Sequence, residues 1–393
     1  MKVVAGVARA TLSVPVTMSS TVTARKVQPS SQTVLHLLPR DMFRGAQSYA
    51  RALVDHLDSD SERHVIAALF SSQDGLARPD FELGVPQGRM RQAGFDPRAM
   101  TRLRRLLRGL RPRLVVAHGG ESAKYASASM PRRLPLVYLM IGSTHERLNG
   151  RARSFLYRRY LHRADRVIAV SQTLADEVVE IHRVPQSKVE VIPNGRDSRV
   201  FVPNPGHARG RSTRVVFIGN LDEAKRPALF LDVISEVRRR GGELEALIVG
   251  SGPLEAELRQ RASRENVTML GVRDDVPRLL GRNDILVFTG RPPEGMPGVL
   301  IEAGLCGLPV VTTRVPGAQD VVVDGSTGFV VDILDQRGLA DSLERLVADA
   351  GLRVSMGLRA RDRCVSRFSL DATTRDWQRV FDTFPKMTRQ IDE

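Results

Sequence analysis

The sequence contains few of the residues that build disulfide scaffolds, zinc sites or membrane spans. Among its 393 residues are two cysteines, Cys306 and Cys364, and one tryptophan, and lysine makes up only six of the 59 basic residues. Two cysteines supply neither a disulfide framework nor a zinc-ligand cluster. No apolar run approaches the roughly 18–20 residues that cross a bilayer. We therefore expect a chain that does not span a membrane and resides in the cytoplasm, a reducing compartment.

What is present is the composition of an ordinary globular protein. Hydrophobic residues make up 42% of the chain and charged residues 26%, which excludes a fibrous or mostly disordered protein. At roughly 100–200 residues per domain, this length predicts two or three domains.

Positive charge is concentrated in the front half of the chain. The net charge is +15; residues 1–198 hold 31 basic and 17 acidic side chains, against 28 and 27 in residues 199–393. Two segments, 89–113 and 147–166, hold nine and seven arginines. They are either solvated helix faces or a surface for an anionic membrane or lipid-linked acceptor. Nucleic acid is not an expected partner, because no nucleic-acid-binding motif accompanies the charge.

Short apolar runs alternate with amphipathic helical segments in two series, which predicts an α/β fold with two doubly wound parallel sheets, each Rossmann-like. In such sheets, ligands bind at the carboxyl ends of the strands, so we expect a cleft between the two domains. Three of the expected helices lie at residues 123–129, 172–182 and 368–384. The expected division of the chain is a disordered extension at 1–32, an N-terminal domain at 33–198, a linker at 199–213, a C-terminal domain at 214–365 and a closing helix within 366–393.

The segment from Thr289 to Ala303 is the strongest candidate for a site. It passes from a buried strand through a Gly/Pro loop into a helix, so backbone amides in its loop are available to an anion. Carboxylates beside such a loop can accept hydrogen bonds from a sugar or ribose diol; the alternative is that they are surface helix residues. The candidate binding residues are Glu294, Gly295, Met296, Pro297, Gly298, Val299 and Glu302.

Several motifs in the same order resemble the family 4 glycosyltransferases, which have the GT-B fold of two Rossmann-like domains. The resemblance covers nearly the whole expected ordered length, and each motif is weak alone. The matching segments are Ala164–Ser171, Val191–Gly195, Gly219–Lys225, Val249–Pro253, Leu270–Val272, the Glu-x7-Glu signature Glu294–Glu302 and Cys306–Val311.

The resemblance implies a retaining transfer of a sugar from a nucleoside diphosphate donor, without a metal or other cofactor. It implies that Glu302 binds the ribose, that Glu294 lies against the donor sugar and that Lys225 neutralises the diphosphate. Val272 would offer backbone groups to the nucleobase. Gly45 and Ala46 would approach the diphosphate from the front domain, onto which the closing helix packs back.

Three positions depart from the family pattern. Asn220 stands where the family usually has an arginine, so one positive charge on the diphosphate is missing. Arg44 stands where a glycine often precedes the first helix, and its charge is a candidate replacement. The histidine that many members carry after the strand at 136–141 has no direct match. His145 and His118 are the alternative catalytic or sugar-binding histidines, each also readable as a structural or solvated residue.

Other phosphate and nucleophile motifs are absent from the sequence. Gly250-Ser251-Gly252 begins like a dinucleotide fingerprint, but Glu255 replaces its third glycine. The sequence has no P-loop and no Gly-x-Ser-x-Gly elbow. Two alternatives remain: an epimerase or phosphorylase on the same fold, and a membrane-surface protein with a decayed transferase site.

Overall fold

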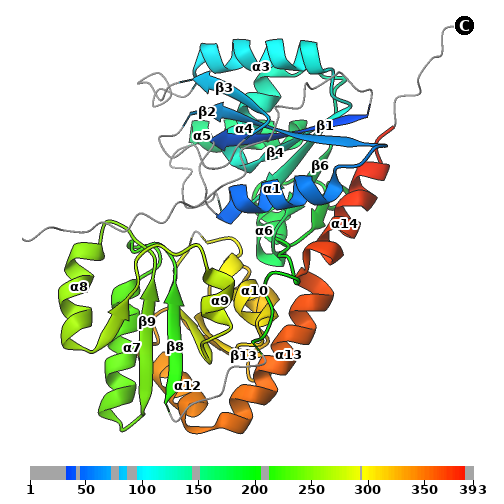
Figure 1. Cartoon of the computed structure of the whole chain (residues 1–393). Helices are drawn as coiled ribbons and strands as arrows, with labels where there is room; N and C mark the ends of the chain where they lie inside the picture. Colours follow the sequence, from blue (N-terminus) through cyan, green and yellow to red (C-terminus); the bar gives the residue numbers. More distant parts are fainter. Residues whose placement is uncertain are drawn as a thin grey trace, which may run out of the picture.

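The structure is a computed structural model that describes residues 32–40, 45–71, 79–85, 95–143, 151–204, 212–292 and 294–385. In this part of the chain the strands form two parallel sheets, each in its own lobe (Figure 1). The strands are buried along most of their length because helices cover both faces, as expected for parallel sheets.

The first lobe is built on a seven-stranded sheet of order β3-β2-β1-β4-β5-β6-β7 within the described residues. Its strands are β1 (Thr33–Arg40), β2 (Arg63–Phe70), β3 (Phe81–Val85), β4 (Leu114–His118), β5 (Leu136–Met140), β6 (Arg166–Ala169) and β7 (Val189–Val191). Its helices are α1 (Gly45–Leu57), α3 (Pro97–Leu110), α4 (Gly119–Ser129), α5 (Arg151–Arg163), α6 (Gln172–Asp176), the π-helical η2 (Glu177–Ile181) and the 3-10 turn η3 (Gln186–Lys188).

The second lobe repeats this design with the order β10-β9-β8-β11-β12-β13. Its strands are β8 (Thr213–Ile218), β9 (Leu244–Val249), β10 (Val267–Met269), β11 (Ile285–Phe288), β12 (Val310–Thr313) and β13 (Gly328–Val331). The helices from here to the end are α7 (Pro227–Arg239), α8 (Glu255–Arg264), α9 (Val276–Leu280), α10 (Gly298–Leu305), α11 (Ala318–Val321), α12 (Gln336–Ala348), α13 (Ala350–Phe368) and α14 (Leu370–Asp382). In both sheets the order reverses beside the first strand of the series, which is the ligand-binding edge of open α/β sheets.

Local sequence explains the helix boundaries, as α3 illustrates. Asp96 caps its N-terminus by accepting a hydrogen bond from the backbone N–H of Arg98, and Pro97 occupies the first helical position. Leu103, Leu107 and two further apolar residues of this helix are buried, while its arginines face outward.

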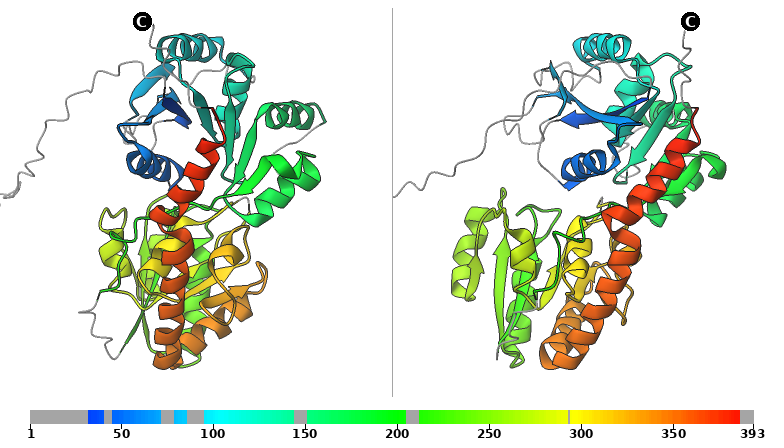
Figure 2. Two further views of the ribbon diagram at one scale, coloured as in Figure 1. Left: turned by 90° about the vertical axis from the view of Figure 1, so that its right-hand side faces the viewer. Right: turned by 45° about the vertical axis from the view of Figure 1, so that its right-hand side comes forward.

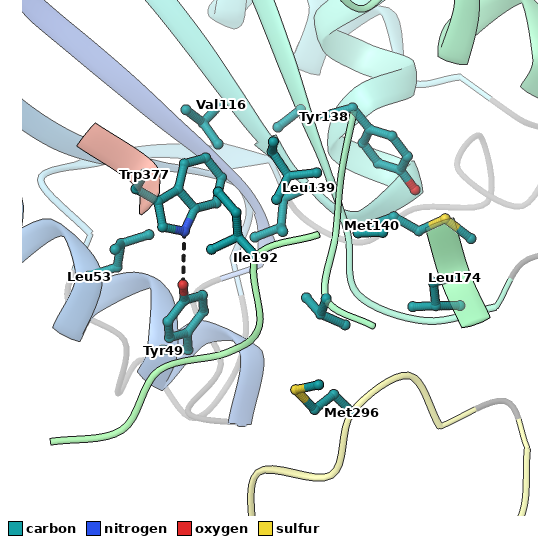
Figure 3. Close-up of a cluster of buried hydrophobic side chains, with 14 of the residues drawn as sticks. Tyr49, Leu53, Val116, Tyr138, Leu139, Met140, Leu174, Ile192, Met296 and Trp377 are labelled. Carbon is teal, nitrogen blue, oxygen red and sulfur yellow. Dashed lines mark hydrogen bonds between the residues drawn. The ribbon is translucent and has the colours of Figure 1, made fainter. Parts of the chain in front are cut away.

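The last two helices connect the lobes. α13 packs on α10 and α12 in the second lobe, and α14 packs on α1 in the first lobe, so the orange-to-red helix pair runs along both lobes in each view (Figure 2). On α14, Trp377 is fully buried and stacks on Phe381. Its indole points to Tyr49 within an apolar cluster of the first lobe (Figure 3). Met296, from the second lobe, lies at the border of the same cluster.

The structure corrects several expected elements. The helix expected at 123–129 begins four residues earlier, at Gly119, and the helix expected at 172–182 changes from α6 to η2 at Glu177. The helix expected at 368–384 is α14, which begins two residues later because the Ser369 side chain caps it by accepting from Ala372 N–H. β3 was not expected.

Residues 1–31, 205–211 and 386–393 lie outside the described part of the chain, so the extension, the linker and the domain boundaries stay predictions. Across the described ranges, the structure holds no helix that is both long and apolar enough to cross a membrane.

Candidate active site

The loop that follows β11 carries the candidate residues of the second lobe. All of β11 is buried, so it fixes the start of this loop, and α10 begins ten positions after the end of β11, at Gly298. Pro297, which precedes the helix, has no side-chain hydrogen-bonding group that could cap it. The N–H groups of the first turn of α10 therefore have no side-chain cap from this position, and such donors suit an anion.

Lys225 joins the loop after β8 to the loop after β11. Oδ1 of Asp222 accepts hydrogen bonds from the backbone N–H groups of Ala224 (3.1 Å) and Lys225 (3.0 Å), which fixes the turn. Lys225 Nζ lies 2.7 Å from Oε1 of Glu294 and 5.0 Å from the ring centroid of Phe288. The Lys225 and Glu294 side chains are 18% and 24% exposed, so the pair is partly accessible to a ligand.

Glu302, on α10, is paired with a residue that follows the first lobe's sheet. Its Oε1 accepts a 2.7 Å hydrogen bond from Nε of Arg196, which follows β7 of the first lobe. Both carboxylates of the Glu-x7-Glu signature are therefore neutralised by a basic side chain in this structure.

Backbone contacts hold the signature loop against the first lobe. Glu294 forms an antiparallel bridge with Gly142, which follows β5. Gly295 is buried, and a Cβ atom there would lie 2.3 Å from the carbonyl oxygen of Ile141. The loop can approach the first lobe this closely only because position 295 has no side chain.

The other predicted binding residues of the second lobe differ in how far they are buried. Met296 and Pro297 are buried, whereas Gly298 and Val299 are half-buried at the start of α10. Asn220 is exposed just after β8. Val272 is 74% exposed and follows β10, which is an outer strand of the same sheet.

In the first lobe, Gly45 and Ala46 are the first two residues of α1. The residue proposed to replace the missing charge, Arg44, lies outside the described residues, and so does His145.

His118 ends β4 and is almost fully buried, at 2% exposure. Its Nε2 lies 3.0 Å from Nδ1 of His36, and Nε2 of His36 lies 3.0 Å from Nδ1 of His64. Nε2 of His64 is 3.1 Å from Oε1 of Glu62, whose other oxygen is bonded to Arg113. Burial lowers the pKa of His118 to about 3, so this imidazole is neutral at neutral pH.

The position of His118 bears on its predicted role. The next residue, Gly119, is positioned so that a Cβ would lie 3.4 Å from the side chain of Ile141. His118 is thus the sequence neighbour of a residue that lies against Ile141, in the loop that contacts the signature. The Nε2 atom of His118, however, is bonded to His36. A catalytic or sugar-binding role for either histidine stays a prediction.

The sequence analysis missed Arg196 and the histidine array. Arg196 directly follows the Val191–Gly195 motif, which could have drawn attention to this position but does not indicate its partner. His36 and His64 each stand alone in an apolar strand, and only the pairing of three strands brings them together.

Within the described ranges, no group of three or more His, Cys, Asp or Glu side chains is arranged to hold a metal ion. The imidazoles of the array bond to one another and to Glu62. That the reaction needs no metal or cofactor stays a prediction.

Two family models match the chain and divide it at the same place as the two sheets. "Glycosyltransferase Family 4" matches residues 43–200, and "Glycosyl transferases group 1" matches residues 212–349. This chain belongs to the family 4 glycosyltransferases. The resemblance inferred from the motifs is therefore confirmed.

Curated relatives of this family member match part of their length. N-acetyl-alpha-D-glucosaminyl L-malate synthase of Bacillus anthracis is 28% identical over 234 residues, which are 56% of this chain and 60% of the relative. D-inositol 3-phosphate glycosyltransferase of Corynebacterium jeikeium is 29% identical over 244 residues, 56% of this chain and 58% of the relative. The matches therefore span about three fifths of these relatives.

A solved structure is similar over almost the whole chain. Anabaena HepE, crystallised in complex with UDP, superposes with a TM-score of 0.76 at 19% identity, covering 89% of this chain and 100% of HepE. Together with the two parallel sheets, this likeness confirms the predicted GT-B fold.

Proposed function

We propose that this protein transfers a sugar from a nucleoside diphosphate sugar to an acceptor, with retention of the anomeric configuration. The observation that carries the proposal is the pairing of Lys225 with Glu294 in the second lobe, on the loop that leads into α10 and Glu302. Family membership supports the same donor class.

In the proposed reaction, the bond between the anomeric carbon and the diphosphate oxygen breaks. The acceptor oxygen forms the new bond on the same face of the sugar, and its proton passes to the leaving phosphate. Lys225 and the amides at the start of α10 stabilise the negative charge on the diphosphate. Glu302 accepts hydrogen bonds from the ribose, and Glu294 orients the donor sugar.

We propose that the acceptor is anionic and bound by the first lobe. The two relatives above are named for L-malate and D-inositol 3-phosphate, which carry carboxylate or phosphate groups. The excess positive charge of residues 1–198 supports an anionic acceptor on this side.

We also propose that the first lobe associates with anionic membranes, which would give access to a lipid-linked acceptor. The arginines Arg102, Arg104, Arg105 and Arg108 of α3 are exposed, while its leucines face the core. On α5, Phe155 and Leu156 are 67% and 45% exposed and stand beside Arg158 and Arg159. Exposed aromatic and aliphatic groups among arginines favour an anionic lipid surface.

The donor site is tested by binding and by rate. A thermal-shift panel of UDP-, GDP- and ADP-sugars should identify a donor, because a bound ligand raises the melting temperature. With that donor, Lys225→Ala and Glu302→Ala should each reduce transfer by about 100-fold or more. Lys188→Ala is the matched control, since Lys188 ends η3 in the first lobe and its Nζ donates to the carbonyl of Ala164.

Other outcomes favour the alternatives. Near-normal transfer by both variants would contradict the proposed site. Water or inorganic phosphate as the only productive co-substrate would indicate an epimerase or phosphorylase. Tight binding to anionic vesicles without any nucleotide-sugar binding would indicate a membrane-surface protein, the reading that Asn220 favours.

A further inference from the structure

Arg196 is held where the polypeptide crosses between the lobes. Its backbone N–H donates to the carbonyl of Phe368 (3.0 Å), and its own carbonyl accepts from the N–H of Leu370 (2.8 Å). It also forms a parallel bridge with Ser369. These bonds fix Arg196 beside the break between α13 and α14, so its side chain starts from a constrained position.

The Arg196 side chain extends over the first turn of α10. Nε donates to Glu302 (2.7 Å) and Nη1 donates to the carbonyl of Gly195 (3.0 Å). A Cβ atom at Gly298 would lie 1.9 Å from Nη2, so the guanidinium lies directly against the backbone of this glycine. Arg196 is only 12% exposed, which shows that it is built into the junction of the lobes.

The start of a helix is an electrostatically unfavourable place for a cation. The N-terminus of α10 carries partial positive charge, so the guanidinium is tolerated there chiefly because Glu302 neutralises it. A bound anion would be attracted both by the helix and by Arg196. Asn220, which is exposed directly after β8 of the same lobe, supplies no such charge.

We propose that Arg196 is a donor-binding residue that exchanges partners. Without ligand it neutralises Glu302. When the hydroxyls of a ribose bind the Glu302 carboxylate, the Arg196 guanidinium binds the diphosphate and supplies the charge that Asn220 lacks. This inference rests on the proposed function, because it assumes a nucleoside diphosphate at the junction.

The exchange keeps both charges paired. Ribose hydroxyls donate hydrogen bonds to the Glu302 carboxylate, and the planar guanidinium can bind two phosphate oxygens at once. Glu302 and Arg196 then each keep a partner in the junction. Leaving either charge unpaired would be costly, because both side chains are only weakly exposed. A nucleoside monophosphate offers Glu302 the same ribose but lacks the second phosphate.

The test compares diphosphates with monophosphates. Calorimetric titrations use UDP, GDP and ADP, and UMP, GMP and AMP. The wild-type chain should bind one diphosphate more tightly than its monophosphate. Arg196→Gln should lower the affinity for the diphosphate by about tenfold or more. Its affinity for the monophosphate should stay equal or rise, because Glu302 no longer has to leave Arg196. Arg196→Lys should retain part of the diphosphate affinity. Arg199→Gln is the control, since Arg199 is 68% exposed and pairs locally with Asp197.

A rescue separates this role from a structural one. Adding Asn220→Arg to Arg196→Gln should restore the affinity for the diphosphate, because it places a cation on the loop after β8 that also carries Lys225. Unchanged diphosphate affinity in Arg196→Gln, equal loss of both nucleotides, or failure of the rescue would overturn the proposal. A wild-type chain that binds none of the six nucleotides would overturn the proposed function itself, and this role with it.

Discussion

The indole Nε1 of Trp377 donates a 2.9 Å hydrogen bond to Oη of Tyr49, although 328 positions separate the two residues. Both side chains are buried, and burial raises the pKa of Tyr49 to about 12. The tyrosine is therefore neutral at physiological pH and accepts the indole hydrogen. This buried hydrogen bond, the His56–Asp371 pair and the surrounding apolar contacts together hold α14 on α1.

Replacing this acceptor should weaken the docking of α14. Tyr49→Phe leaves the buried indole N–H without its partner, so we expect the free energy of unfolding to fall by about 1–3 kcal/mol. Urea unfolding followed by the fluorescence of Trp377, the single tryptophan, measures the change. Tyr160→Phe, at a partly exposed position on α5, is the control. Equal stability of the two variants would contradict a structural role for this bond.

Contact between the lobes should depend on Gly295. In Gly295→Ala the new methyl group would meet the carbonyl of Ile141, so the signature loop must move away from the first lobe. We expect transfer to fall by about tenfold or more, since small displacements in an active site have large effects on rate. Gly109→Ala is the matched control because a Cβ there meets nothing within 4 Å. Equal rates in the two variants would show that the contact is dispensable.

The buried histidines should make the protein acid-sensitive. Burial, together with the neighbouring His118 and His64, lowers the pKa of His36 well below 6.5, and burial lowers that of His118 to about 3. Between about pH 6.5 and 3, the unfolded chain therefore binds more protons than the folded chain, so stability falls as the pH falls.

The size of this effect can be measured. At pH 5, His118 alone should lower the free energy of unfolding by about 2 kcal/mol relative to pH 7, and His36 should lower it further. Urea unfolding at pH 7, 6 and 5 gives the slope, and His118→Asn should make it shallower. Parallel pH dependences of variant and wild type would contradict the assignment.

The exposed apolar groups of α5 offer a test of membrane association. Phe155→Ser combined with Leu156→Ser should reduce binding to phosphatidylglycerol-containing vesicles by about tenfold, because both groups would leave water on binding. Sedimentation with the vesicles measures the bound fraction, which should also fall with added salt. Leu334→Ser, at an 87% exposed leucine of the second lobe, is the control. An equal effect of the control would exclude α5 as the binding surface.

The alternating architecture could be predicted because parallel strands are buried on both faces. β1, β4 and β5 therefore appear in the sequence as short apolar runs between helical segments. β3 has no such run, since Glu82 and Gly84 interrupt five residues of which Leu83 is buried. The start of α14 was expected within two residues, since Ser369 is a capping residue that directly precedes an amphipathic pattern.

The candidate site was predictable where its residues are close in the sequence. Glu294 and Glu302 belong to one loop and helix, so their spacing alone suggests a shared site. Arg196 pairs with Glu302 across 106 positions, and as one of many arginines it has no local pattern that indicates this partner. The histidine array depends on strand register, which determines the face of the sheet that each side chain occupies.

The docking of α14 on α1 has a consequence for biosynthesis. During translation, Tyr49 and the whole first sheet emerge from the ribosome long before Trp377 is added to the chain. The nascent first lobe must wait, with one flank of α1 uncovered, while all of the second lobe is translated. The first lobe therefore completes its packing only after the second lobe has been translated, and premature termination before α14 would leave a polypeptide that chaperones and proteases can recognise.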